Sequence, residues 1–208
     1  MSFATRLLLD SDISRCVDIY FAAFQNPHSL ACWPRGVPAV RSWWEAMFHD
    51  ELHEPGSTWI KAVSHETGEI AAYCKWRQHE EGCVLETDLP QWPEGADARL
   101  CDETFGDWAR KHLELMGGKG HMYLEMVATD PKFQGQGAGS QLMRWGLARA
   151  DQDGVESYLE ASPDAVRLYE HLGFHEAGRT DTWIENERVK PRTLYRNLFM
   201  IRPAKERR

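Results

Sequence analysis

The chain has 208 residues, of which 42% are hydrophobic and 27% charged, a composition typical of one folded domain with a sizeable core. Charged residues interrupt its apolar runs within a few positions, which excludes a membrane span. The formal net charge is −8, with acidic residues spread over the whole length, so no basic face is expected to bind the phosphates of a nucleic acid.

The N-terminus and the cysteines point to an unprocessed, cytoplasmic protein. Only three consecutive leucines precede Asp10, too few for the apolar region of a secretory signal. The five cysteines are odd in number and scattered, which predicts free thiols in a reducing compartment. His49 and His53 have i, i+4 spacing without the His-Glu-x-x-His order, and Pro55 ends the helix nearby, so no metal ion is expected.

In the first half of the chain, hydrophobic periodicity predicts two helices followed by a β-hairpin. Residues 25–38 separate the helices and contain three prolines and a glycine, which predicts a loop. The expected helices cover residues 11–24 and 40–51, and the expected strands cover residues 57–63 and 70–78.

The second half predicts helices that alternate with strands. Residues 79–98 are rich in acidic residues and proline, which indicates an irregular, mobile connection. Residues 203–208 are expected to fray. The expected helices are 100–116, 138–150 and 165–172, and the expected strands are 121–129, 155–161, 174–184 and 193–201. A hairpin followed by alternating strands and helices indicates one α/β (α+β) domain over residues 1–208.

A glycine-rich loop lies between a predicted strand and a predicted helix. Residues 134–139 contain three glycines, which let the backbone turn tightly and bring N–H groups against a ligand. The helix that follows offers unpaired N–H donors and a partial positive charge, which together hold phosphate oxygens. The loop lacks the Gly-Lys-Ser/Thr ending of a P-loop and does not follow a first strand, as a dinucleotide-binding loop would. Taken alone, it is also compatible with a plain tight turn.

Two motifs in order resemble the GNAT N-acetyltransferase superfamily. Gln134-x-x-Gly137-x-Gly139, preceded by Ala-Thr-Asp-Pro, looks like the acetyl-CoA pyrophosphate motif of that family. Residues 159–162 (LEAS) and 168–174 (LYEHLGF) are similar to its fifth strand and the helix that follows. The motifs lie within residues 121–178, and the N-terminal part fits only in the order of its elements. The whole sequence looks most like the fungal, small-molecule members.

The resemblance implies a mixed, mostly antiparallel sheet with helices on both faces, splayed between its fourth and fifth strands. In this family the pantetheine arm of acetyl-CoA pairs with the fourth strand, and the amides of the loop hold the pyrophosphate. Many relatives have an Asn after the fifth strand, for which Ser162 or Asp164 would substitute. The implied cofactor-binding residues are Met126, Val127, Ala128, Gln134, Gly135, Gln136, Gly137, Ala138, Gly139, Ser140, Ser162 and Asp164.

The resemblance also implies catalytic roles. Tyr169 stands where the family places a tyrosine that protonates the departing thiolate, and a phenol with a pKa of about 10 stays protonated at neutral pH. Glu125 is the first candidate base, because it lies two residues before Val127 and strand alternation puts both on one face. Tyr123, acting through water, is the second. Trp33 is difficult to bury in a proline-rich loop and is expected to wall the acceptor site.

The expected function is direct transfer of an acetyl group from acetyl-CoA to an amine of a small molecule, by a monomer or a homodimer. Two alternatives stay open: acetylation of a protein N-terminus or lysine, and a CoA-binding regulatory domain without catalysis. The aromatic N-terminal region and the connection at 79–98 favour a covered pocket over an open groove. Neither a nucleic acid nor a membrane is an expected partner, and the sequence does not specify the acceptor.

Overall fold

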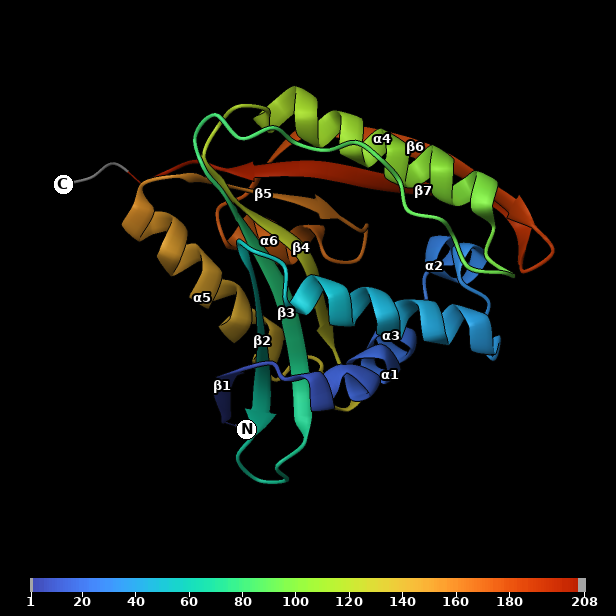
Figure 1. Cartoon of the computed structure of the whole chain (residues 1–208), viewed down its shortest axis with the longest axis horizontal. Helices are drawn as coiled ribbons and strands as arrows, with labels where there is room; N and C mark the ends of the chain where they lie inside the picture. Colours follow the sequence, from blue (N-terminus) through green and yellow to red (C-terminus); the bar gives the residue numbers. More distant parts are fainter. Residues whose placement is uncertain (1, 206–208) are drawn as a thin grey trace.

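Seven strands form one sheet in the computed structural model, which describes residues 2–205 (Figure 1). The strand order is β1-β2-β3-β4-β5-β7-β6, and neighbours are antiparallel except for the parallel pair β4 and β5. The strands are β1 (Phe3–Leu7), β2 (Ser57–Ser64), β3 (Ile70–His79), β4 (His121–Thr129), β5 (Glu156–Ala161), β6 (His175–Asn186) and β7 (Val189–Arg202). This mostly antiparallel α/β domain confirms the predicted fold class.

Helices cover both faces of the sheet (Figure 1). α5 packs across β1 to β5 on one face, α1 and α3 pack on β2 to β4 on the other, and α2 and α4 lie against β6 and β7. The helices are α1 (Ile13–Ala23), α2 (Pro27–Cys32), α3 (Pro38–Leu52), α4 (Ala98–Met116), α5 (Ala138–Asp153) and α6 (Val166–His171), with short 3-10 turns at η1 (Asp10–Asp12) and η2 (Pro131–Phe133). Within residues 2–205, no helix is both long and apolar enough to cross a bilayer.

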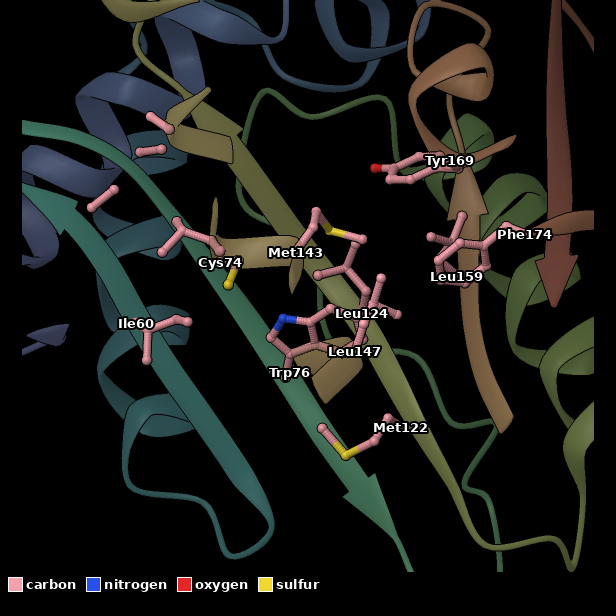
Figure 2. Close-up of a cluster of buried hydrophobic side chains, with 14 of the residues drawn as sticks. Ile60, Cys74, Trp76, Met122, Leu124, Met143, Leu147, Leu159, Tyr169 and Phe174 are labelled. Carbon is pink, nitrogen blue, oxygen red and sulfur yellow. The ribbon is translucent and has the colours of Figure 1, made fainter. Parts of the chain in front are cut away.

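The core under α5 is built around a tryptophan on β3. Trp76 is fully buried, and Figure 2 shows its ring beside Leu124 and Leu147. Gly146 of α5 makes this approach possible, because a Cβ atom there would lie 2.1 Å from the Trp76 ring. The helix therefore presses directly on the β3–β4 part of the sheet, which fixes the strands that carry the site.

β4 parts from β5 halfway along its length. The two strands pair from His121 opposite Glu156 only as far as Leu124 opposite Leu159, which confirms the expected splay. A β-bulge lies at the same point on the β3 side of β4: Trp76 pairs with Leu124 and Lys75 with Met126, so that Glu125 is the extra residue.

The bulge changes which side chains share a face. Beyond it Val127 packs against the core under α5, whereas Met126 and Ala128 pack on the opposite side. Glu125 contacts Lys75, whose ammonium lies 5.8 Å from the ring of Trp59 in that second core. The expectation that Glu125 and Val127 share a face is therefore wrong, because one extra residue shifts the alternation.

The structure contains two elements that the sequence did not predict. Part of the expected loop at 25–38 is the helix α2, which begins at Pro27 after Asn26 has capped it by accepting a hydrogen bond from the Ser29 amide at 2.9 Å. The strand β1 pairs with β2 at the edge of the sheet. The other expected elements are present with shifted ends. β7 begins at Val189 and contains Pro191, which falls in an irregular part of the β6–β7 pairing.

Residues 80–97 have no regular secondary structure, as expected. Hydrogen bonds fasten this connection: the Trp43 indole donates to the Gln91 carbonyl at 2.9 Å, and the Trp92 indole donates to Asp102 at 2.7 Å. In the tail, Lys205 pairs with Asp151, and residues 206–208 lie outside the described residues.

Candidate active site

One cleft of about 780 Å³ opens where β4 and β5 separate and runs from the glycine-rich loop to α1, α2 and α4. The cleft brings together most of the site residues expected from sequence: Trp33, Glu125, Met126, Val127, Ala128, Gln134, Gly135, Gly139, Ser162, Asp164 and Tyr169. Expected residues outside its lining are Tyr123, Gln136, Gly137, Ala138 and Ser140. A second cleft, between α4 and β6, contains none of the expected residues.

The glycine-rich loop has the conformation that its composition requires. Gly135 and Gly137 have φ of 72° and 90°, and open space surrounds the position of a Cβ atom at both. Gly139 packs against β4, since a Cβ atom there would lie 2.9 Å from the Thr129 hydroxyl. α5 begins at Ala138, and the N–H groups of its first turn have no partner within the helix. An open turn with free amide donors and a positive helix end fits a diphosphate.

Two polar side chains at this loop are already engaged within the protein. The Gln136 side chain donates to the Lys132 carbonyl at 2.8 Å, and the Lys132 ammonium pairs with Glu69 at 2.7 Å. A phosphate at the loop would therefore meet backbone N–H groups rather than these side chains.

Tyr169 extends from α6 into the gap between the parted strands. Its ring packs in the core under α5, with the centroid 6.0 Å from that of Phe174, and its side chain is 5% exposed. Figure 2 shows its hydroxyl directed toward β4. Burial raises the pKa of Tyr169 above its usual value, so the hydroxyl remains protonated and able to donate.

Glu125, the first candidate base, is engaged by two cations of β3. One carboxylate oxygen pairs with Lys75 and the other with Arg77. Lys75 is 3% exposed and also pairs with Glu51 at 2.9 Å, and Arg77 also pairs with Glu54. Both Glu125 oxygens are thus engaged by ion pairs with β3 at the bulge.

Glu160 of β5 is a cleft residue that the sequence reasoning did not select. One of its oxygens accepts a hydrogen bond from the Tyr123 hydroxyl at 2.8 Å, and the other is buried without a hydrogen-bond partner among the described residues. Burial, together with the nearby Glu125 carboxylate, raises the pKa of Glu160 to about 7. Burial also raises the pKa of Tyr123 far above its usual value, so Tyr123 acts as a donor that holds Glu160.

Aromatic rings line the end of the cleft away from the glycine-rich loop. They are Tyr20, Phe24, Trp33, Trp44, Phe105, Trp108 and Tyr195. Trp33 was expected to be difficult to bury, which is wrong: it is 1% exposed and stacks on Trp43 at 5.4 Å, because α2 draws the chain into the core. Its position still contributes to the cleft wall.

Two polar residues at the aromatic end also escaped sequence reasoning. His28 stacks on Tyr195 at 4.8 Å, and burial lowers the pKa of His28 to about 4, so its ring is neutral. Asn197 of β7 is 2% exposed, and both of its amide atoms are buried without a partner among residues 2–205. A buried amide without partners is available to a ligand in the cleft.

Comparison with known proteins matches this geometry. A family model described as "Acetyltransferase (GNAT) family" matches residues 14–174. A mycothiol acetyltransferase from Brachybacterium faecium is 36% identical over 112 residues, which cover 48% of this chain and 34% of that protein. The chain spans only 24–34% of the curated relatives it matches.

Among solved structures, a protein from Corynebacterium glutamicum described as histone acetyltransferase HPA2 and related acetyltransferase has a TM-score of 0.62 at 24% identity, over 100% of this chain and 99% of that one. A mosquito arylalkylamine N-acetyltransferase like 5b has a TM-score of 0.67 at 11% identity, over 97% and 99% of the two chains. At these identities the likeness shows the fold.

The splayed sheet with an open glycine turn at the end of β4 is the fold of these N-acetyltransferases. The family match covers most of the chain. This protein belongs to the GNAT acetyltransferase family.

Proposed function

We propose that this chain transfers the acetyl group of acetyl-CoA to a primary amine on a small molecule with an apolar, aromatic-sized body. A single observation carries the proposal: one continuous cleft joins the glycine-rich loop and Tyr169 to Glu160 and the aromatic end. Amine acetylation needs these parts together, namely a diphosphate site, a proton donor, a proton acceptor and a place for the amine.

In the proposed reaction, proton transfer is divided between two residues. The free oxygen of Glu160 takes a proton from the amine as the nitrogen attacks the thioester carbonyl carbon. The new C–N bond forms, the C–S bond breaks, and the Tyr169 hydroxyl gives its proton to the departing sulfur. Exchange with solvent then returns both side chains to their starting states. A carboxyl group with a pKa of about 7 suits this task, because it is ionised in half or more of the molecules at neutral pH and above and still binds a proton well.

The walls of the aromatic end support the substrate class. The rings of Trp33, Trp44, Phe105 and Trp108 contribute a largely apolar surface, which favours an apolar acceptor body. Asn197 adds a donor and an acceptor for a polar group on that body. Because α2 and α4 both contribute to these walls, the pocket suits a compact molecule better than a polypeptide chain.

A panel of amines tests the proposal, with acetylated product and released CoA measured by mass spectrometry. The panel contains arylalkyl amines, short aliphatic polyamines, and peptides with a free N-terminus or lysine. We expect arylalkyl amines to exceed peptides at least tenfold in kcat/KM. A peptide preference would refute the acceptor class and leave the acetyltransferase assignment standing. Thermal stabilisation by acetyl-CoA without any acetylated product would refute catalysis and favour a regulatory CoA-binding domain.

A further inference from the structure

Three histidines from separate elements meet at the end of β4 that lies away from the glycine-rich loop. His79 is the last residue of β3, His121 is the first of β4, and the two are direct partners in the antiparallel pairing. His112 reaches them from α4. One nitrogen from each ring lies within 4.8 Å of the others, and none of the three residues lines the cleft.

Hydrogen bonds fix the direction in which one of these rings offers its lone pair. The His121 Nδ1 lies 2.8 Å from the Lys119 carbonyl oxygen, which can only accept, so this nitrogen carries the proton. The His121 Nε2 is then unprotonated and accepts a hydrogen bond from the His112 Nε2–H at 2.8 Å. A backbone carbonyl that orients a histidine in this way is a regular feature of metal sites.

The third histidine, His79, has a ring nitrogen that lacks a hydrogen-bond partner in the part of the chain that the structure describes. The His79 Nε2 is buried without a hydrogen-bond partner among residues 2–205, while its ring stacks on His121 at 4.6 Å. A buried nitrogen without a partner is costly, and a shared cation would satisfy it together with its neighbours.

The surroundings keep the imidazoles neutral and oriented. His112 contacts two tyrosine rings, stacked on Tyr158 at 4.5 Å and 4.3 Å from Tyr123. Burial lowers the pKa of His79 to about 4 and that of His112 to about 3, so both rings are neutral at neutral pH. A metal ion at the His112 Nε2 would move the proton of that ring to its Nδ1. Tetrahedral zinc with bonds of about 2.1 Å sets its nitrogens roughly 3.4 Å apart, which lies within the range of the present spacing.

We propose that His79, His112 and His121 bind a divalent transition-metal ion, with zinc as the probe that matches three neutral imidazoles. Three protein ligands leave a fourth position for water. The ion fastens α4, which carries Phe105 and Trp108 of the acceptor end, to the strands β3 and β4. The sequence predicted no metal because the ligands lie 33 and 9 residues apart, outside any local motif.

Metal titration of the chelator-treated full chain tests the site without reference to catalysis. Co²⁺ binding is followed by the absorption bands of tetrahedral cobalt, and Zn²⁺ affinity by competition. His79→Gln removes one ligand at a strand end, where the fold tolerates change best. The matched control is His53→Gln, because Asp10, His49 and His53 form a second, exposed group of metal-ligating side chains.

We expect one tetrahedral ion per wild-type chain, a roughly 100-fold loss of affinity in His79→Gln, and wild-type binding in His53→Gln. Zinc should raise the melting temperature of the wild type and of His53→Gln, and not that of His79→Gln. The proposal is overturned if the wild type binds no stoichiometric ion, if His79→Gln binds as tightly as the wild type, or if His53→Gln alone loses the ion. Since none of these readouts involves acetyl transfer, their failure leaves the proposed function untouched.

Discussion

Replacing Glu160 with glutamine tests the electrostatics of the cleft most directly. The carboxyl group accepts from Tyr123 with one oxygen, while its other oxygen is buried and unpartnered among the described residues. Glutamine keeps the shape of the side chain and the acceptor for Tyr123 but cannot ionise. The substitution therefore removes one titratable group and leaves the packing of the side chain nearly unchanged.

The expected difference in unfolding free energy between the two proteins follows from the pKa of Glu160. A rise from 4.5 to about 7 corresponds to about 3 kcal/mol, at roughly 1.4 kcal/mol per unit. Because the folded state holds its proton more tightly than the unfolded state, this stabilisation is complete below about pH 4.5. It is lost as the pH rises toward 7 and is constant above that value. Wild-type stability should thus fall by about 3 kcal/mol relative to Glu160→Gln across this window.

Urea unfolding of both proteins between pH 4.5 and 8.5 measures this difference. In parallel, kcat/KM should rise with an apparent pKa of about 7 in the wild type, and this limb should disappear in Glu160→Gln. The acceptor should have its own pKa outside that range. If the unfolding free energies of the two proteins change in parallel over this pH range, the raised pKa of Glu160 is refuted. Loss of the limb in Glu125→Gln but not in Glu160→Gln would move the base to Glu125.

Three further substitutions probe the loop, the proton donor and the core. Gly137→Val forces a branched side chain to φ of 90° and places it over open space at the loop, so we expect acetyl-CoA to lose at least tenfold in affinity, measured by calorimetry. Tyr169→Phe should lower kcat roughly 100-fold and leave acetyl-CoA affinity unchanged in equilibrium binding. Gly146→Ala should destabilise the fold by about 1–3 kcal/mol in urea unfolding, because the new Cβ atom meets the Trp76 ring.

Each of the three has a matched control elsewhere in the chain. Gly68→Val imposes similar strain, at φ of 72°, in the β2–β3 turn and should leave acetyl-CoA binding intact. Tyr73→Phe removes a buried hydroxyl outside the cleft and should leave kcat unchanged. Gly106→Ala in α4 adds an ordinary contact with Leu89 at 3.5 Å and should stabilise the fold. Equal effects in a control and its partner would contradict the corresponding mechanism.

Local patterns in the sequence predicted most of the fold. Periodicity located most helices and strands, and the two motifs predicted the splayed sheet and the place of the cleft. α2 was missed although its start signal was present, since Asn26 followed by Pro27 is a cap and a first helical residue. β1 was missed because its five residues show no clear alternation of burial.

The choice between Glu125 and Glu160 as the proposed base depends on contacts that no local sequence pattern contains. Glu125 and Glu160 both lie on strands beside a cofactor motif, and both are glutamates of the cleft. They differ in their partners, which lie far away in sequence. Of the two, only Glu125 forms ion pairs with Lys75 and Arg77 of β3, and Tyr123 donates a hydrogen bond to Glu160. Such pairings follow from the register of the sheet, which the bulge alters by one residue.

The bulge at Glu125 explains how one cleft holds two carboxylates with separate roles. The bulge lies where β4 leaves β5, and the ion pairs to β3 stabilise an extra residue that has no partner of its own in the β3–β4 pairing. Lys75 and Arg77 hold Glu125 in place, while burial, together with the nearby Glu125 carboxylate, raises the pKa of Glu160. Glu160 has a tyrosine partner and no cation among the described residues, so its proton can be exchanged near neutral pH. A carboxyl group with an exchangeable proton, beside a second carboxyl group engaged by two cations, suits the proposed use of Glu160 as the base.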